Sequence, residues 1–559
     1  MIKEWLPSDL YKLERYQPKE WLPFQNSHKK ALKAIYKNSL SLQDNHLLVG
    51  WYKGNQLLAV CDGEMKENTF FVTNIMSTSN LFGFNECMMM LEEIVKSRRL
   101  SEIYLPDFSD VSLAKNKLLE LGFVRRSQPQ KGYYYQVSYH TGVVLGGGGA
   151  RGSYQVGAWH ALREIGVMYD LVSGTSVGAL NGAFMVQGNL EDAEDMWRDI
   201  ATDKILNLSL DDTENKTREN LIQGVKVLTL SALKEKGVDS TPLYHMIETM
   251  IDEEKMFNPN KKAIDFYFVT TLAPKMEETV ISLKDVPKDE LSKWLLATSS
   301  FYPAMKACEI NGQYYIDGGY RNNIPKDILL NQGATELIVI DVKGPGFIKP
   351  VRVPRAICET TITSRWGLGA VLLFDKERAA WNMQLGYLDT MRSFHRYEGT
   401  WYALNPNHYK KEAVQLTKGF LAYLKSDEFF KQLGKKVTPK WMMQHHLQPE
   451  LFAVYLLEET ARIVSVDPSK LYTIDELCEE VVTIFNEKKE EVDEQMLLSL
   501  SEWLVDYVKQ TVPLSEKTIL EYNYHLIETQ SEMVERLFDF SWKSVLQALF
   551  INFLKERKA

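Results

Sequence analysis

The sequence predicts an α/β protein whose central part is built on a mostly parallel sheet. Strand-like and helix-like segments alternate from residue 141 to about residue 350, as the crossovers between parallel strands require. The run Glu-Leu-Ile-Val-Ile-Asp-Val at 336–342 is continuous and rich in β-branched residues, which is typical of a strand buried on both faces. Two of the other predicted strands run directly into glycine-containing turns.

Three regions follow one another along the chain. Residues 1–138 are predicted to form a small α+β domain, 141–350 the central α/β domain, and 351–559 a mainly helical region that partly completes the central domain. In the first domain the pattern predicts helices at 30–38, 86–96 and 112–121, and strands at 47–52, 56–61, 69–75, 102–105 and 133–137. In the second it predicts strands at 142–145, 171–173, 265–271 and 336–342.

The overall composition excludes several functional classes. The 559 residues carry a net charge of −9, which leaves no basic surplus for general nucleic-acid binding. The five cysteines, at 61, 87, 308, 358 and 478, are scattered, so neither a disulfide framework nor a zinc site is expected. The N-terminus does not resemble a signal peptide, and no apolar stretch approaches about 18 residues. We therefore expect a cytoplasmic protein whose membrane contact is peripheral at most.

An apolar face near the C-terminus has two interpretations. Its residues recur at helical spacing: Phe538, Trp542, Val545, Leu546, Leu549, Phe553 and Leu554. The basic end of this segment would let an amphipathic helix lie on an anionic membrane. Packing into the core of the helical region is the commoner outcome, and it is the one we expect.

Two predicted turns of the central domain contain the candidate catalytic groups. Gly146–Gly149 follows the strand predicted at 142–145, and Gly174-Thr-Ser176-Val-Gly178 follows the strand at 171–173. Because parallel strands end at the same sheet edge, main-chain N–H groups of the first turn would lie near the Ser176 hydroxyl. This combination suits acyl transfer, in which a nucleophile attacks a carbonyl while donors hold the oxyanion.

Each turn also has other interpretations. A G-x-S-x-G turn exposes a serine between a strand and a helix, but it can also be a structural turn. Gly147, Gly149 and Gly152, with Asp170 downstream, match a dinucleotide-binding pattern. Tight packing of strand and helix is a third reading of the glycines. We favour an oxyanion hole, because a dinucleotide site has no use for a serine turn on the next strand.

Asp317 is the candidate base. It ends a predicted strand and is followed by Gly318 and Gly319, which permit close backbone approach. A direct Ser–Asp pair works only if proton transfer accompanies attack and the oxyanion donors carry much of the stabilisation. A Ser-His-Asp triad is the alternative, with histidines at 245, 395, 408, 445, 446 and 525, none in a recognisable context. His160 is expected to be a packed or surface residue.

In its combination of motifs, the chain resembles the patatin-like phospholipases. The motifs are Gly-Gly-Gly-Ala-Arg-Gly at 147–152, Gly-Thr-Ser-Val-Gly at 174–178, the segment 297–303, and Asp317-Gly-Gly with Asn323-Ile-Pro, over about residues 141–345. The resemblance implies a three-layer α/β/α fold and hydrolysis of lipid esters, with no metal or cofactor. It also implies a role for each motif residue: Ser176 as nucleophile, Asp317 as base, Gly147, Gly148 and Gly149 as oxyanion hole, and Arg151, Gly152, Gly174, Gly178, Gly318 and Gly319 as supporting residues.

The N-terminal region resembles the N-acetyltransferase (GNAT) fold more weakly, through 74–77, 86–96 and 118–124. That family holds the pyrophosphate of CoA on a loop opening the central helix. The corresponding stretch here, 80–85, lacks the basic first residue and the second small residue, so we expect a structural or regulatory domain.

The sequence thus predicts a serine lipid acyl hydrolase of phospholipase or lysophospholipase type. A lipid transacylase using the same residues, and a non-catalytic lipid-binding or regulatory protein, are the alternatives.

Overall fold

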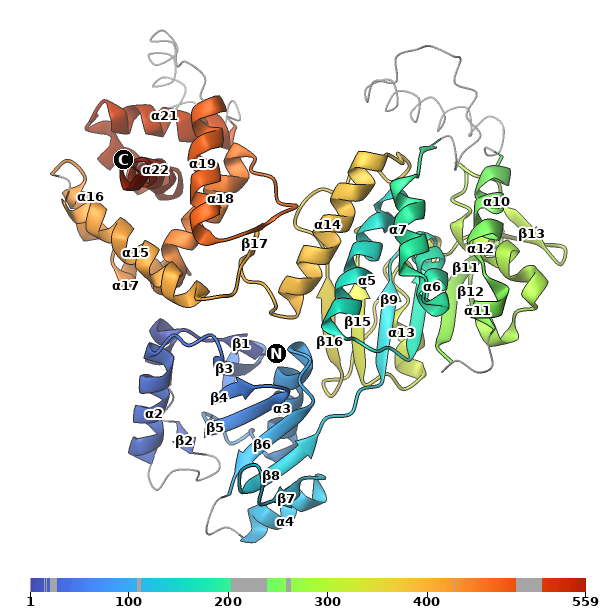
Figure 1. The fold of residues 1–559 in the computed structure, drawn as a ribbon, viewed down its shortest axis with the longest axis horizontal. Coiled ribbons are helices and arrows are strands. Elements are labelled where there is room, and N and C mark those ends of the chain that lie inside the picture. The colour runs from blue at the N-terminus through green and yellow to red at the C-terminus, as the bar shows by residue number, and fades with distance from the viewer. Residues whose placement is uncertain are drawn as a thin grey trace. The chain divides into compact units, whose positions relative to one another are not determined.

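The fold is described from a computed structural model (Figure 1). It describes residues 2–14, 16, 18–20, 28–107, 112–202, 239–257, 263–426, 428–488 and 515–558. Contacts divide the chain into two compact units. Unit 1 comprises residues 1–90, 102–135 and 397–559, and unit 2 comprises residues 91–101 and 136–396.

The sheet of unit 2 confirms the predicted fold class. Its order is β13-β14-β11-β10-β9-β15-β16. The five strands from β11 to β16 run parallel to their neighbours in this order. They are β9 (Thr141–Leu145), β10 (Leu171–Thr175), β11 (Asp265–Ala273), β15 (Glu336–Ile340) and β16 (Cys358–Ile362). An antiparallel edge joins β11: β12 (Glu277–Ser282), β13 (Cys308–Ile310) and β14 (Gln313–Asp317). The strand that ends at Asp317 was predicted from the sequence, whereas β12 and β13 were not.

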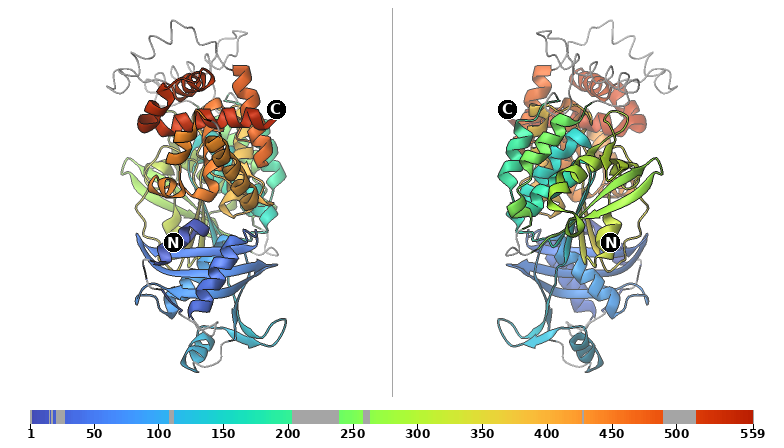
Figure 2. Two further views of the ribbon diagram at one scale, coloured as in Figure 1. Left: turned by 90° about the vertical axis from the view of Figure 1, so that its left-hand side faces the viewer. Right: turned by 90° about the vertical axis from the view of Figure 1, so that its right-hand side faces the viewer.

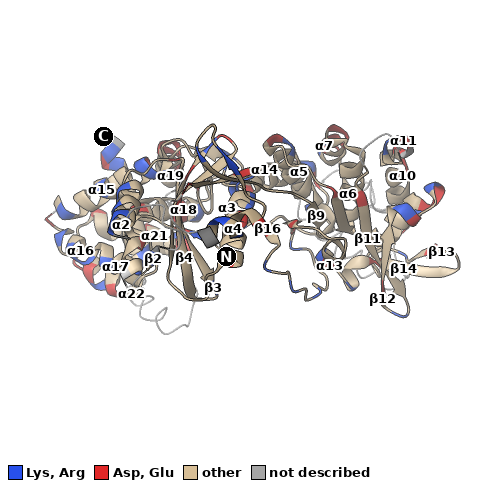
Figure 3. Ribbon diagram, turned by 90° about the horizontal axis from the view of Figure 1, so that it is seen from below, with Lys and Arg blue, Asp and Glu red and all other residues tan. Residues whose placement is uncertain are grey.

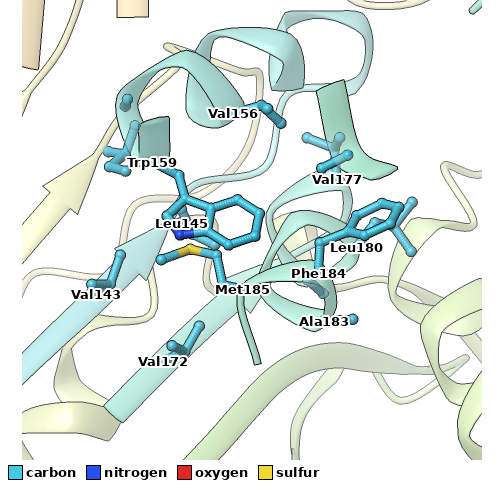
Figure 4. Packing of buried hydrophobic residues seen from close by; sticks show 14 of the residues in the cluster. Val143, Leu145, Val156, Trp159, Val172, Val177, Leu180, Ala183, Phe184 and Met185 are labelled. Atoms are coloured by element: carbon cyan, nitrogen blue, oxygen red, sulfur yellow. The ribbon is translucent and has the colours of Figure 1, made fainter. Parts of the chain in front are cut away.

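Helices cover both faces of this sheet, as the right-hand view of Figure 2 shows. The helices of unit 2 are α5 (Ser153–Ile165), α6 (Val177–Gln187), α7 (Leu190–Arg198), α10 (Thr241–Met250), α11 (Glu253–Met256), α12 (Leu291–Ser299), α13 (Lys326–Asn331) and α14 (Lys376–Ser393). Because successive side chains of a strand point to opposite faces, Val143 and Leu145 join the core cluster under α5 and α6, whereas Val144 joins the cluster under α13. Figure 4 shows the first of these clusters around Trp159 and Phe184.

Unit 2 continues beyond residue 350, where the central domain was predicted to end. Strand β16 extends the sheet, and α14 packs directly on α5. The two helices approach so closely that a Cβ on Gly157 would lie 1.8 Å from the carbonyl oxygen of Met383. A Cβ on Gly386 would lie 2.0 Å from that of Tyr154. The Tyr154 hydroxyl also donates to Asp389 of α14 at 2.8 Å. The segment up to Arg396 therefore belongs to this unit.

Unit 1 contains a second sheet, of order β1-β3-β4-β5-β6-β8-β7 with β2 beside β5. Its strands are β1 (Ile2–Glu4), β2 (Lys19–Glu20), β3 (His46–Lys53), β4 (Gln56–Lys66), β5 (Thr69–Ser77), β6 (Glu102–Pro106), β7 (Val124–Arg126) and β8 (Gly132–Gln136). Helices α2 (His28–Leu40), α3 (Phe84–Ser97) and α4 (Ser112–Glu120) accompany them. At the start of α3 the Glu86 carboxylate accepts the Gly83 N–H at 3.1 Å. A carboxylate thus occupies the helix N-terminus where a phosphate would otherwise bind, and the GNAT resemblance stays a prediction.

Helices form the rest of unit 1: α15 (Tyr409–Ser426), α16 (Lys431–Lys436), α17 (Pro439–Gln444), α18 (Phe452–Val464), α19 (Ile474–Lys488), α21 (Glu516–Glu528) and α22 (Met533–Lys558). The apolar face predicted near the C-terminus lies on α22, and Phe538, Leu546 and Leu549 on it are buried. Packing into the core is therefore confirmed for this face. Among the described residues, no helix combines the length and hydropathy needed to cross a bilayer. Figure 3 marks the positions of Lys and Arg and of Asp and Glu, and both signs occur among the helices of each unit.

Candidate active site

Ser176 lies in a sharp turn between β10 and α6. Its backbone angles are φ 55° and ψ −128°, a conformation that costs a residue with a side chain about 1–3 kcal/mol. The turn is tight, because a Cβ on Gly174 would lie 2.4 Å from the Gly178 oxygen, and one on Gly178 would lie 2.2 Å from the Leu145 oxygen. Both glycines of the motif are therefore required by close backbone approach.

Thr298 holds the backbone of this turn. Its hydroxyl accepts the Ser176 N–H at 3.0 Å and donates to the Val269 carbonyl. Thr298 is fully buried on α12. The Ser176 N–H is thus engaged within the protein, and oxyanion donors have to come from elsewhere.

The strand register explains why Asp317 lies beside Ser176. Thr175, the last residue of β10, pairs with Val269 of β11, and the next residue, Thr270, pairs with Asp317 of β14. The two strands therefore end at the same level of the sheet, one register position apart. Ser176 and Asp317 line the same cavity, and the Ser176 side chain lowers the pKa of the Asp317 carboxyl. The Oδ1 atom of this carboxylate accepts the Gly319 N–H at 2.7 Å. The structure thus brings together the predicted nucleophile and base.

The Asp317 carboxyl is unusually basic for an aspartate. Burial raises its pKa from 3.8 to about 6, although the hydrogen bonds from Ser176 and the Gly319 N–H act in the opposite direction. Taking a carboxylate out of water disfavours its charged form, and two donors offset only part of this cost. A base with this pKa is better matched to work near neutral pH than an ordinary aspartate.

The glycine loop differs in one position from the prediction. The Gly147 N–H donates to the Asn323 carbonyl at 3.1 Å, so this amide is already used and cannot serve as a free oxyanion donor. Within the described part of the chain, the amides of Gly148 and Gly149 have no such partner, and both residues line a cavity beside Ser176. The candidate oxyanion hole is therefore reduced to Gly148 and Gly149.

The remaining motif residues support this loop and the base. Arg151 donates to the carbonyl of Gly369 at 2.9 Å and to that of Lys343, tying the glycine loop to the segments around it. A Cβ on Gly152 would lie 2.3 Å from the Val177 side chain. One on Gly318 would lie 2.1 Å from the Val269 oxygen, so only glycine lets Asp317 approach β11 this closely.

A cavity of about 300 Å³ opens at the dyad. Besides Ser176 and Asp317, its walls are mostly apolar: Leu180, Met196, Trp197, Ile200, Leu243, Met246, Phe301, Met305, Tyr320, Phe347, Val371, Leu372 and Phe374. Its volume is at the lower end of the range usual for small-molecule sites. The cavity is chemically suited to an acyl chain, with its polar groups confined to the dyad, the glycine loop and a few hydroxyl and amide groups.

The dinucleotide-binding and Ser-His-Asp interpretations find no support in this geometry. Asp170 precedes β10, at the opposite sheet edge from the glycine loop, and accepts the Thr141 N–H at 3.2 Å. It cannot contact a ribose bound at that loop. None of the described histidines lines the cavity, and His160 pairs with Glu194 on a half-exposed surface.

Two positioning residues were not assigned roles from the sequence. Thr298 lies in the segment 297–303, which was noted only for its family resemblance, and no local sequence pattern links it to Ser176 or Asp317. Asn323 was noted only as part of a motif. Its carbonyl accepts the Gly147 N–H, and its side-chain amide donates to the Gly147 oxygen at 3.3 Å. Asn323 therefore holds the glycine loop in place through two hydrogen bonds to Gly147.

The strain at Ser176 gives a stability prediction. Glycine adopts positive φ without steric cost, whereas alanine keeps the strain. We expect Ser176→Gly to be more stable than Ser176→Ala by about 1 kcal/mol, after allowing for the greater entropy of glycine in the unfolded chain. Urea denaturation of the two variants measures the difference. Equal stability, or a less stable glycine variant, would show that the turn is unstrained.

Comparisons with known sequences and structures find proteins that are similar to this chain. A family model described as “Patatin-like phospholipase” matches residues 143–330. The chain is 31% identical to human “Patatin-like phospholipase domain-containing protein 6” over 246 residues, which are 42% of this chain and 16% of that protein. It is 27% identical to “Neuropathy target esterase sws” of Drosophila melanogaster over 208 residues, 36% of this chain and 13% of that protein. Among solved structures, VipD from Legionella pneumophila aligns with 77% of this chain and 94% of its own, at 13% identity and a TM-score of 0.31.

The chain spans only about a sixth or less of the length of these two sequence relatives. The matched region nevertheless coincides with the part in which the glycine loop, the serine turn and the Asp-Gly-Gly segment occur. The resemblance inferred from those motifs is thereby confirmed: residues 143–330 match the patatin-like phospholipase family model.

Proposed function

We propose that this protein is a serine lipid acyl hydrolase that cleaves carboxylic esters of lipids with a Ser176–Asp317 dyad. One observation carries the proposal. Ser176 and the buried carboxylate of Asp317 lie together at a largely apolar cavity that Gly148 and Gly149 also line. The names of the relatives, phospholipase and esterase, support the same class of reaction.

In the first half-reaction, Ser176 Oγ attacks the ester carbonyl carbon as Asp317 takes the hydroxyl proton. The carbonyl oxygen becomes negatively charged and accepts hydrogen bonds from the Gly148 and Gly149 amides. The N-terminus of α6 directly after Ser176 adds a favourable dipole. The tetrahedral intermediate then collapses, the C–O bond to the alcohol breaks, and Asp317 returns the proton to the departing oxygen.

In the second half-reaction, water replaces the alcohol. Asp317 takes a proton from this water, which attacks the acyl-enzyme carbonyl, and the same amides hold the oxyanion. Collapse releases the fatty acid and restores the Ser176 hydroxyl with the proton held by Asp317. No histidine takes part in either step.

The test is hydrolysis of a panel of lipid esters by the native protein. Free fatty acid and the matching alcohol are the expected products, both with and without an added acceptor lipid or CoA. Acyl transfer to the acceptor in preference to water would support the transacylase alternative. A lack of turnover across phospholipid, lysophospholipid and acylglycerol substrates would contradict the proposal.

The raised pKa of Asp317 predicts the acid limb of the pH profile. Because the base has to be ionised, and its pKa in the free enzyme is about 6, kcat/KM should fall about tenfold per pH unit below pH 6. An ordinary aspartate would keep the enzyme fully active to about pH 4. Initial rates between pH 4 and 8 with an uncharged ester measure the limb. A limb near pH 4 would mean that Asp317 is not the buried base described here.

A further inference from the structure

Ser299 lines the cavity, but the mechanism proposed above assigns it no role. It is the last residue of α12 and lines the same cavity as Ser176 and Asp317. Its side chain is 8% exposed, and among the described residues its Oγ has no hydrogen-bond partner. A buried hydroxyl without a partner lowers stability, and such groups in native proteins call for an explanation.

The neighbours of Ser299 hold both members of the dyad. Thr298 accepts the Ser176 N–H at 3.0 Å, and the Ser300 carbonyl accepts the Asp317 N–H at 2.9 Å. Ser299 is thus fixed between the two attachment points, on the cavity wall beside the reacting groups. Rotation about its χ1 angle alone redirects the hydroxyl.

The mechanism proposed above already supplies some of the interactions that the two oxygens of a bound ester need. In the proposed mechanism the carbonyl oxygen accepts hydrogen bonds from the Gly148 and Gly149 amides, and the alcohol oxygen receives its proton from Asp317. An additional donor on the side of Asp317 would stabilise the negative charge that develops on the alcohol oxygen as the C–O bond breaks. Water attacks from this same position in the second half-reaction, so one hydroxyl would serve both steps.

We propose that the Ser299 hydroxyl donates a hydrogen bond to the alcohol oxygen of the bound ester and, after the alcohol has left, contacts the attacking water. This inference rests on the proposed function and adds a third side chain to it. The hydroxyl transfers no proton; Asp317 remains the group that gives and takes it.

The experiment compares Ser299→Ala with the native protein on two esters of one fatty acid. For an alkyl ester, whose leaving oxygen is strongly basic, kcat/KM should fall about tenfold, the effect of losing one hydrogen bond. For the p-nitrophenyl ester the fall should be less than about threefold, because p-nitrophenolate leaves without help. The variant should also unfold at the same temperature as the native protein or higher, since an unsatisfied group has been removed.

Ser153→Ala is the matched control. Ser153 is fully buried, its Oγ likewise has no partner among the described residues, and it does not line the cavity. It should keep full activity on both esters. An unchanged alkyl-ester rate in Ser299→Ala would overturn the inference, as would an equal loss on both esters with lowered stability. If the native protein hydrolyses neither ester, the proposed function itself fails, and the inference with it.

Discussion

Ser176→Ala is expected to lower kcat/KM for ester hydrolysis by about 10⁴-fold or more while leaving the fold intact. Loss of a serine nucleophile removes the covalent pathway, and only binding and the oxyanion donors remain. Alanine keeps the backbone conformation of the turn, so the Thr298 contact to the residue 176 N–H should persist. Steady-state kinetics and a circular-dichroism melting curve measure the two effects.

Ser173→Ala is the control for this variant. Ser173 lies on β10, the strand that leads to Ser176. It is fully buried and donates to the Pro325 carbonyl at 3.0 Å, but it does not line the cavity. Its replacement should cost about 1 kcal/mol of stability and leave kcat/KM nearly unchanged. If Ser176→Ala retained more than a tenth of the native activity with a native melting curve, Ser176 would not be the nucleophile.

Asp317→Asn is expected to have opposite effects on activity and on stability. Without the carboxylate, Ser176 has no base, and a positioned base is worth about 10²–10⁴-fold in rate. The buried charge also destabilises the native state: raising the pKa from 3.8 to about 6 corresponds to about 3 kcal/mol. Asparagine has no charge to bury and can still accept the Gly319 N–H.

The sign of the stability effect depends on pH. Between about pH 4 and 6 the unfolded chain releases the Asp317 proton while the native protein keeps it, so the native protein loses stability as pH rises through this range. Asp317→Asn should therefore be more stable than the native protein above pH 6 and no more stable below pH 4. Denaturant unfolding at pH 4 and pH 8 measures both limits. A variant that is less stable at pH 8 would contradict the burial of an ionised carboxylate.

The sequence alone predicted those strands and turns that have a distinctive local pattern. The strand at 336–342 and the glycine loop after residue 145 were predicted because a buried parallel strand and a tight turn each have a distinct local signature. The proximity of Ser176 and Asp317 needed more than this, since 141 residues separate them. The Asp-Gly-Gly turn makes Asp317 a candidate base, and the family resemblance pairs it with Ser176. The structure explains their proximity by the register of β10, β11 and β14.

Other features depend on long-range contacts that no local pattern encodes. The edge strand β12 is amphipathic and short, and β16 lies after the apparent end of the domain, so neither has a strong signal. That α14 completes unit 2 follows from its packing against Gly157, not from its own periodicity. The engagement of the Gly147 amide by Asn323 likewise could not be read from a run of four identical glycines.

The central claim is that Ser176, activated by Asp317, becomes covalently acylated. Labelling the native protein with a fluorophosphonate that carries an alkyl chain, followed by mass spectrometry of its peptides, tests this most directly. We expect the phosphonyl group on Ser176 alone, with no labelling of Ser176→Ala and slow labelling of Asp317→Asn. Labelling at another serine with Ser176 unmodified, or equal labelling of native and Ser176→Ala protein, would contradict it.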